Sequence, residues 1–460
     1  MVAHTQLRPR QAPGTTVTVL NALKFLRWDL VDLMEFMFHT YGDIAHLHAP
    51  GQDVIFVSNP EYAYEVLIDN VKSFDKMKNA QGKQDGLGLV FGKGLLTNLE
   101  HDSWLTQRRM LQPVFHRKHI TAISDRMVAA GERMIERWQQ DFKPGQQFNL
   151  YPEMTVLTLD VVGQTLFTLS MAEVGPKVGP AIDVAAVFAY QRERTPVRIP
   201  MGIPTPAHVK FKHAMDEVDD LLYGIIRDRR ASSAEYDDLM AMLLAARDEA
   251  TGEGMDDKQL RDEIITIFGA GHDTTANALS WIWYLLAMHP EVLKKLQDEV
   301  DTVLGDRSPS AADLPNLPYT LQVFEEAMRL YPPSPAVPRE ALEETTIGGY
   351  HIPDGAKVLL NIISIHRNPA FWPEPEKFKP ERFAPGVNEK RHRFAFMPFG
   401  GGPRQCIGNN FALMEGHLLL ALMAQHVELK LVPGQDVKRE IAITMRPRHG
   451  LQVTYHPRQK

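Results

Sequence analysis

The sequence contains a single cysteine, Cys406, among 460 residues. This scarcity excludes a disulfide within the chain and any zinc site built on two or four cysteines. Positive charge is not in excess either, because 50 Lys and Arg residues stand against 57 Asp and Glu residues and give a formal net charge of −7. General nucleic-acid binders are normally basic, so we expect no nucleic-acid partner.

Long apolar runs are missing as well. Residues 1–30 carry several charged side chains and no apolar stretch of signal-peptide or membrane-spanning length. The run 281–288 is apolar but far too short to cross a bilayer. We therefore expect a protein without a membrane anchor, located in the cytoplasm and monomeric.

Internal repeats, low-complexity tracts and linkers rich in glycine, serine or proline are also absent from the sequence. Length alone would allow about three domains. The lack of linkers favours a single domain over residues 1–460 instead. Hydrophobic residues make up 44% and charged residues 23%, which is typical of a globular protein and excludes a disordered or fibrous chain.

Apolar spacing predicts a mainly α protein with a small β portion. Helical spacing occurs in seven segments: 102–115, 120–142, 155–169, 206–230, 236–250, 256–288 and 317–330. Strand-like alternation and turn signals occur in three regions: about 41–60, about 340–365 and a C-terminal hairpin at about 427–455. At about 1.5 Å per residue the segment 256–288 would be roughly 50 Å long, so we expect it to run through the interior.

Cys406 lies between a glycine-rich loop and a predicted helix over 409–425. The three consecutive glycines 400–402 allow positive φ angles or a close approach of the backbone to another group. The start of a helix stabilises a thiolate through its N–H groups and its dipole. A buried, inert cysteine is the alternative, but it would need neither the glycines nor Arg404. An iron-bound thiolate would use both.

The segment 399–408 reads F-G-G-G-P-R-Q-C-I-G and matches the pattern F-x-x-G-x-R-x-C-x-G at every fixed position. It resembles the haem-binding loop of the cytochrome P450 family. The resemblance implies that Cys406 is the axial ligand of haem b iron and that Phe399 and Gly408 help to bind the haem. A thiolate ligand pushes electron density onto the iron. It also implies the fold of that family, with a long central helix over the haem and the cysteine loop on the opposite face.

Glu326 and Arg329 stand three residues apart in the helix that the prolines 332–333 should end. Such a pair is usually a surface ion pair worth about 0–1 kcal/mol. Apolar neighbours on both sides indicate burial here. The pair resembles the family's E-x-x-R motif, and Arg382 in the run P-E-R-F resembles its partner. The resemblance implies a buried structural triad that fixes the cysteine loop.

The long predicted helix contains A-G-H-D-T-T over residues 270–275. This resembles the family's oxygen-activating motif, which implies that Asp273 and Thr274 deliver protons and that Ala270 contacts the haem. Gly269 and Gly271 each cost a helix interior roughly 1 kcal/mol relative to alanine. They serve either the approach of another helix or the approach of a flat cofactor and its bound oxygen.

Trp104 and Arg108, four residues apart, present an indole N–H and a guanidinium on one helix face. Both suit a carboxylate, and the pair resembles the family's W-x-x-x-R motif, which implies contact with the haem propionates. The alternative is a tryptophan packed on an arginine stem. Further candidates for the propionates are Arg339, Arg404 and, more weakly, His101. Two other histidines are interpreted as surface or turn residues: His351 and His366.

The resemblance also implies a substrate pocket lined mostly by small or aliphatic residues: Leu95, Leu96, Ile264, Ile265, Phe268, Ala270, Ser334, Ala336, Val337 and Ile443. Such a lining predicts an apolar and fairly roomy cavity. Terpenoids, steroids, polyketides and fatty acids all remain open as substrates. Alternatively, several of these residues simply belong to the core.

The leading hypothesis is a haem-thiolate monooxygenase that uses O₂ and two electrons to hydroxylate or epoxidise a hydrophobic small molecule. A peroxide-driven peroxygenase is one alternative, which the presence of Asp273 and Thr274 disfavours. A haem-thiolate ligand sensor without turnover is another. We expect no fused reductase and a separate ferredoxin or flavodoxin with its reductase as electron donor. The basic runs 116–119 and 390–393 either dock that partner or are ordinary solvated surface.

Overall fold

The computed structural model describes residues 9–18, 28–77, 86–169, 181–182, 184–192, 195 and 198–458. The chain divides into two compact units. Unit 1 comprises Met1–Met77, Gln322–Cys406 and Lys438–Arg448, and unit 2 comprises Lys78–Leu321, Ile407–Val437 and His449–Lys460. Each unit draws on separate stretches of the chain. The single domain expected over residues 1–460 stays a prediction.

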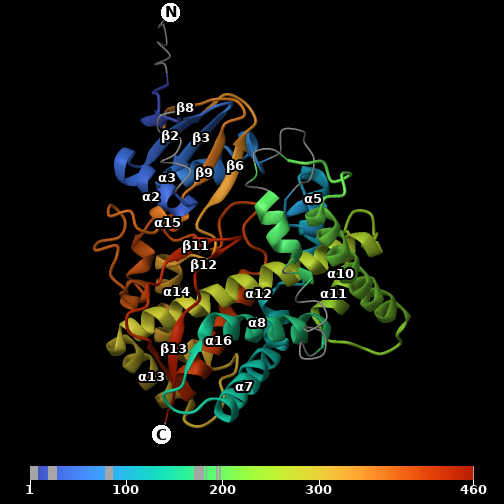
Figure 1. Cartoon of the computed structure of the whole chain (residues 1–460), viewed down its shortest axis with the longest axis vertical. Coiled ribbons are helices and arrows are strands. Elements are labelled where there is room, and N and C mark those ends of the chain that lie inside the picture. The colour runs from blue at the N-terminus through green and yellow to red at the C-terminus, as the bar shows by residue number, and fades with distance from the viewer. Residues whose placement is uncertain are drawn as a thin grey trace, which may run out of the picture. The chain divides into compact units, whose positions relative to one another are not determined.

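Unit 1 is built on a six-stranded sheet with strand order β1-β2-β3-β9-β6-β4 (Figure 1). The strands are β1 (Gly14–Thr16), β2 (Ile44–Ala49), β3 (Gln52–Val57), β4 (Phe74–Asp75), β6 (Val337–Ala341) and β9 (Lys357–Leu360). Strands β2 and β3 form an antiparallel hairpin, whereas β3 and β9 run parallel. The two predicted strand regions near 41–60 and 340–365 therefore pair with each other in one sheet.

Alternation along β3 fills the two faces of this sheet. Ile55 and Val57 belong to one buried apolar cluster, and Phe56 between them belongs to another. The second cluster includes Met34 and Met37 from α2 (Leu30–Tyr41). Unit 1 also contains these smaller elements: α3 (Pro60–Tyr64), α15 (Ile362–Ile365), β7 (Thr345–Ile347), β8 (Tyr350–Ile352), β11 (Arg439–Ile441) and β12 (Met445–Pro447). Helix α14 (Pro318–Leu330) begins in unit 2 and carries the E-x-x-R residues in unit 1.

Unit 2 is mainly helical and is centred on α12 (Asp257–Met288), the long helix drawn in yellow in Figure 1. Asp256 caps it by accepting a hydrogen bond from the Gln259 N–H at 2.7 Å. Helices α8, α10 and α16 pack against it. The other helices of this unit include α4 (Gly88–Phe91), α5 (His101–Leu111), α6 (Arg117–Ala122), α7 (Ser124–Asp141), α8 (Leu150–Phe167), α10 (Pro206–Ala231), α11 (Leu239–Ala245), α13 (Pro290–Leu304) and α16 (Asn409–His426).

Two predicted helices differ from the structure. The segment 120–142 is interrupted at Ile123, whose φ of −105° and ψ of 3° are not helical, so α6 and α7 are separate. The segment 236–250 shortens to α11 because the Asp248 carboxylate accepts hydrogen bonds from the N–H groups of Ala250 and Thr251 and forms a turn. Helices α2 and α13 were not predicted.

The C-terminal β region forms a second sheet, in unit 2. Strand β10 (Val427–Leu431) pairs antiparallel with β13 (Gln452–Pro457), and β5 (Gln147–Asn149) adds to the other side of β13. The two ends of the region predicted as a hairpin over 427–455 do pair with each other. The chain between them is long, however, and contains β11 and β12 of unit 1. Within the described residues, no helix combines the length and apolar character needed to cross a membrane.

Candidate active site

The glycine-rich loop before Cys406 is a tight turn. The Cys406 N–H donates to the Phe399 carbonyl at 3.0 Å, and Gly400 and Gly402 have φ angles of +69° and +71°. A Cβ atom on Gly402 would lie 2.3 Å from the Leu67 carbonyl oxygen, so no larger residue fits there. The loop ends on an exposed cysteine. The glycines therefore serve both roles predicted for them, positive φ and close backbone approach.

Glu326, Arg329 and Arg382 lie together in the interior of unit 1. Arg329 donates through Nε and Nη2 to the two carboxylate oxygens of Glu326 at 2.6 and 2.8 Å, and both residues have no exposed surface. The Arg382 Nε lies 3.3 Å from Glu326 Oε1. Arg329 also donates to three backbone carbonyls, those of His366, Pro375 and Lys377. One guanidinium thus joins α14 to two other segments of the chain.

His366 connects this group to the cysteine loop. It lies in the turn after α15, as one of its two interpretations predicted, but it is buried and not at the surface. The side chain is fully buried, with Nδ1 3.3 Å from the Arg329 carbonyl oxygen and Nε2 2.9 Å from the Met397 N–H. Burial, helped by the neighbouring Arg329 and Arg367, lowers the His366 pKa to about 3. The ring is therefore neutral: Nδ1–H donates and Nε2 accepts. The Met397 carbonyl in turn accepts from the Gly400 N–H at 2.9 Å.

A cluster of three cations surrounds Asp75 in unit 1. Strand β4 pairs with β6 so that Asp75 lies opposite Glu340, which brings Lys76 close to Arg339. The Arg404 Nη2 lies 3.3 Å from Asp75 Oδ1. Burial together with Arg404 and Arg339 lowers the Lys76 pKa to about 7, and burial together with Arg404 lowers the Arg339 pKa to about 10. Both arginines are propionate ligands predicted from the sequence, whereas Lys76 was not predicted.

This cation cluster fits the group that the sequence implies. Burial and mutual repulsion disfavour the charged form of Lys76, and a bound anion would offset both effects by favouring that form. A haem carries two propionates, and the same unit presents the Cys406 thiol. The donor set of unit 1 therefore matches a doubly anionic, iron-containing cofactor.

Helix α5 of unit 2 places Trp104 and Arg108 one turn apart. Trp104 is buried, Arg108 is half-buried, and the exposed His101 ring lies 6.0 Å from the Trp104 ring between centroids. The two side chains predicted to bind propionates thus share one face of this helix.

The centre of α12 directs its polar side chains to different partners. The Thr274 hydroxyl donates to the Ala270 carbonyl, one turn back, at 2.8 Å. Asp273 faces α8, where the Tyr151 hydroxyl donates to its Oδ1 at 3.4 Å. Thr275 donates to Glu415 on α16 at 3.0 Å. Neighbouring residues in the predicted acid–alcohol pair therefore point to different faces of the helix.

Close packing accounts for both glycines of the long helix. A Cβ atom on Gly269 would come within 2.8 Å of the Phe91 ring, and one on Gly271 within 3.2 Å of a Val162 methyl group. Of the two explanations left open by the sequence, the approach of another helix is the one that this geometry supports.

The residues predicted to line a substrate pocket divide between the two units. Unit 2 holds the buried Ile264, Ile265 and Phe268, with Leu95, Leu96 and Ala270; unit 1 holds Ser334, Ala336, Val337 and Ile443. The Leu95 N–H donates to Glu263 at 3.0 Å, which ties that segment to α12. Unit 2 has a cavity of about 540 Å³ between α5 and α11, lined by residues such as Arg109 and Met242 and by none of the predicted pocket residues.

Comparison with known proteins gives concordant matches. The sequence model of the family described as Cytochrome P450 matches residues 11–454. The chain is 33% identical to Cyclooctat-9-en-7-ol 5-monooxygenase of Streptomyces melanosporofaciens, over 92% of this chain and 90% of that protein. It is 32% identical to Protein LUTEIN DEFICIENT 5, chloroplastic, of Arabidopsis thaliana, over 98% and 77%. The crystal structure of the cytochrome P450DA heme domain aligns with a TM-score of 0.90 at 26% identity, over 98% of both chains.

Proposed function

Because the chain belongs to the cytochrome P450 family and is a monooxygenase of that family, we propose that it hydroxylates or epoxidises a hydrophobic small molecule. The family uses a haem with a cysteine thiolate as iron ligand, and it uses O₂ and electrons from a redox partner. The fold of the family, with its predominance of helix and its small sheet portion, is the fold of this chain.

The main support for a haem cofactor is the cluster of Lys76, Arg339 and Arg404 around Asp75. The Cys406 thiolate would bind the iron of haem b, and Lys76, Arg339 and Arg404 would hold its propionates, with Phe399 and Gly408 as further parts of the loop. Trp104 and Arg108 have the same role from helix α5. Bound haem supplies the iron at which O₂ is activated, and the thiolate favours O–O cleavage.

Asp273 and Thr274 deliver protons in this proposal. The Thr274 hydroxyl keeps its hydrogen bond to the Ala270 carbonyl, which fixes the position of Oγ1 for proton transfer. Asp273 takes up protons at its carboxylate, which the Tyr151 hydroxyl holds toward α8. Since the two side chains lie on different faces of α12, water molecules must carry the proton between them.

A terpenoid is the substrate class that the comparisons favour. The Streptomyces relative is named as a monooxygenase of cyclooctat-9-en-7-ol, an alicyclic alcohol. All but one of the predicted pocket residues are apolar, which suits such a molecule. The experiment is to titrate the holoprotein with terpenoid alcohols, steroids, polyketides and fatty acids and to follow the haem spin state. A spin-state change with another class alone would replace terpenoids with that class.

The electron donor is proposed to be a separate ferredoxin or flavodoxin with its reductase. Of the two basic runs, 116–118 is exposed, whereas 390–393 is partly used in packing, with the Arg391 guanidinium 3.8 Å from the Trp372 ring centroid and Arg393 4.5 Å from that of Tyr64. The run 116–119 is therefore the better docking candidate.

Location in the cytoplasm and the monomeric state stay predictions.

Replacing Thr274 by alanine tests the proton-delivery role. We expect haem binding to persist but product formation to fall at least about tenfold, with the electrons released as hydrogen peroxide, because general acid catalysis contributes about 10²–10⁴-fold. The measurement is the ratio of product and peroxide to NAD(P)H consumed.

Thr266→Ala is the matched control for this variant. Thr266 lies on the same helix and its hydroxyl makes the same kind of bond, to the Asp262 carbonyl at 2.7 Å. Coupling should stay normal in Thr266→Ala. Equal loss of coupling in both variants would show that the backbone bond, and not proton delivery, matters at position 274.

Replacing Lys76 by methionine tests the cation cluster. A hydrogen bond to a charged group is worth about 1.5–3 kcal/mol, and 1.4 kcal/mol is a factor of ten. The holoprotein should therefore lose haem to an acceptor apoprotein at least about tenfold faster. Lys72→Met, which removes an exposed lysine four residues away, should leave the rate unchanged. Wild-type haem retention in Lys76→Met would exclude Lys76 from the propionate site.

A further inference from the structure

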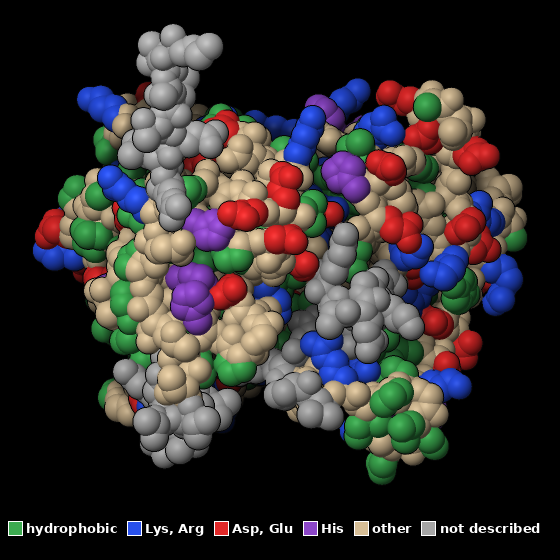
Figure 2. Space-filling view, turned by 90° about the horizontal axis from the view of Figure 1, so that it is seen from above, with side chains coloured by type: hydrophobic (Ala, Val, Ile, Leu, Met, Phe, Trp, Pro, Cys, Tyr) green, Lys and Arg blue, Asp and Glu red, His purple; other side chains and the backbone are tan. Residues whose placement is uncertain are grey.

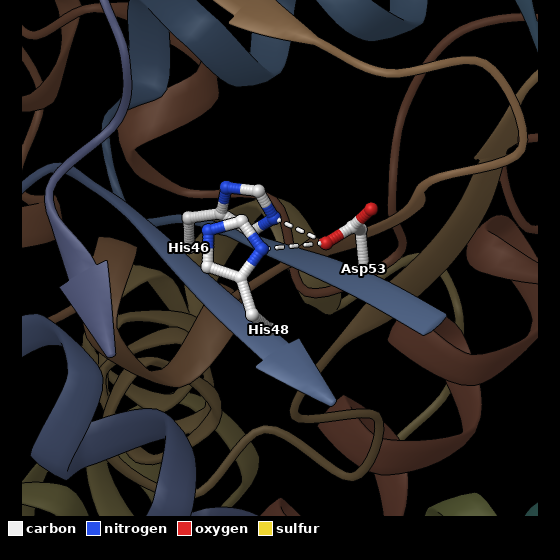
Figure 3. Close-up of side chains that lie close together, drawn as sticks. All are labelled: His46, His48 and Asp53. Atoms are coloured by element: carbon white, nitrogen blue, oxygen red, sulfur yellow. Dashed lines mark hydrogen bonds and ion pairs between the residues drawn. The ribbon is translucent and has the colours of Figure 1, made fainter. Parts of the chain in front are cut away.

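The hairpin of β2 and β3 carries three side chains with metal-binding atoms on one face. His46 and His48 are two residues apart on β2 and therefore point to the same side of the sheet. The register of the hairpin pairs His48 with Asp53 on β3. Figure 3 shows the two imidazole rings side by side and the carboxylate of Asp53 directed at both of them.

One oxygen of Asp53 is shared by the two histidines. Oδ1 lies 2.9 Å from His46 Nε2 and 2.8 Å from His48 Nδ1, and the two ring centroids are 3.6 Å apart. The three candidate ligand atoms all lie within 4.8 Å of one another. Each histidine thus offers one ring nitrogen toward the same point. The three ligand atoms therefore already point toward one another without an ion present.

Burial differs across the cluster in a way that suits a bound ion. The His46 side chain is 4% exposed, whereas those of His48 and Asp53 are 51% and 36% exposed. The first ligand is therefore fixed by its surroundings, and the other two leave a route open from solvent. Figure 2 shows histidine side chains, in purple, next to acidic side chains, in red, on the face of the molecule seen there.

We propose that His46, His48 and Asp53 bind a divalent late transition-metal ion, with Zn²⁺ as the representative, independently of the haem chemistry proposed above. Zn²⁺ binds imidazole nitrogen and carboxylate oxygen at about 2.0–2.2 Å, which puts tetrahedral ligand atoms about 3.3 Å apart. The present separations of 2.8 and 2.9 Å need to open by only about half an ångström. Water completes the fourth position. Two nitrogens and one oxygen favour zinc, copper or nickel over calcium or magnesium.

The ion would also hold the first strand of the sheet in place. The His46 N–H donates to the Pro13 carbonyl at 2.8 Å, and the His48 carbonyl accepts from the Val17 N–H at 2.7 Å. Strand β1 approaches so closely that a Cβ atom on Gly14 would lie 1.8 Å from the His46 carbonyl oxygen. Because the backbones of both histidine ligands bind β1, fixing their side chains stabilises its attachment.

The test is equilibrium dialysis of the holoprotein against Zn²⁺, with bound zinc counted by elemental mass spectrometry. Wild type should bind one equivalent that His48→Ala and Asp53→Asn weaken at least about tenfold, since even residues that only support a ligand change metal affinity by 10–100-fold. Both positions are accessible, so these variants should fold, unlike changes at the buried His46. His213→Gln is the matched control, because His213 lies 3.4 Å from Glu217 and is exposed.

Amide hydrogen exchange provides a second measurement. Zinc bound elsewhere on the protein would not change the exchange rates of the amides near this site. Zinc should slow exchange of the His46 and Val17 amides, which join β1 to β2, in wild type but not in His48→Ala. The proposal is overturned if wild type binds no zinc, if His48→Ala and Asp53→Asn bind it as wild type does, or if His213→Gln is weakened equally. Binding without slower exchange would overturn the coupling to β1.

Discussion

Replacing Cys406 by serine should abolish the red-shifted Soret band of the reduced, carbon monoxide-bound protein and reduce turnover to background. The chain has no other cysteine, so no second thiolate can take its place. A serine hydroxyl stays protonated at neutral pH and is a poor electron donor to iron, so the push that favours O–O cleavage is lost. This is the largest effect that we expect from any single substitution.

The fold should survive this change. The turn before Cys406 is held by the bond from its N–H to the Phe399 carbonyl and by the positive φ angles of Gly400 and Gly402, none of which uses the sulfur atom. Circular dichroism and the urea midpoint should therefore match wild type. Gln405→Ala, which changes the exposed neighbour and keeps the thiol, is the control and should keep the normal spectrum. A normal spectrum and normal turnover in Cys406→Ser would disprove the assignment.

Replacing Glu326 by glutamine should be the most destabilising change. The side chain keeps its shape, but the guanidinium groups of Arg329 and Arg382 lose the buried carboxylate that both face. Removing one partner of a buried ion pair costs about 3–5 kcal/mol, whereas a whole domain is stable by only about 5–15 kcal/mol. We expect a lower yield of haem-containing protein and a lower urea midpoint.

An exposed ion pair supplies the matched control for this variant. Lys294 and Asp298 form an ion pair one helical turn apart on α13. Asp298→Asn removes a carboxylate in the same way but at the surface, and it should cost less than about 1 kcal/mol. If Glu326→Gln lowers the urea midpoint no more than Asp298→Asn does, the buried carboxylate does not stabilise the fold.

Local patterns predicted the helices well where the signals were contiguous. The helix predicted over 256–288 appears as Asp257–Met288, since a capping aspartate, an apolar stripe and the following Pro290 all lie within one stretch. The break at Ile123 is marked by neither glycine nor proline, and its local signal is the pair Ser124 and Asp125, residue types that are common at helix starts. These types also occur inside helices, so the apolar spacing over 120–142 predicted one continuous helix.

The candidate site shows the same division. The cysteine loop could be predicted because its fixed residues lie within ten positions of one another. Lys76 could not, because its place near Arg339 depends on the pairing of β4 with β6 across more than two hundred residues. The burial of His366 was missed for a similar reason. The mostly apolar run Ile362–Ile365 just before it was the one available signal of burial, and its partners Arg329 and Met397 lie far away in sequence.

The interleaved composition of unit 1 has a consequence for synthesis of the protein in the cell. Val54 on β3 pairs with Lys357 on β9, which is synthesised about 300 residues later in the chain. At about 5–20 residues per second the ribosome needs roughly 15–60 s to supply that partner. During this interval the β2–β3 hairpin has an unpaired edge that other nascent chains could join. Cys406 and Arg404 emerge later still, so we expect cofactor loading to begin only near the end of translation, when the supply of haem and chaperones should set the yield of active enzyme.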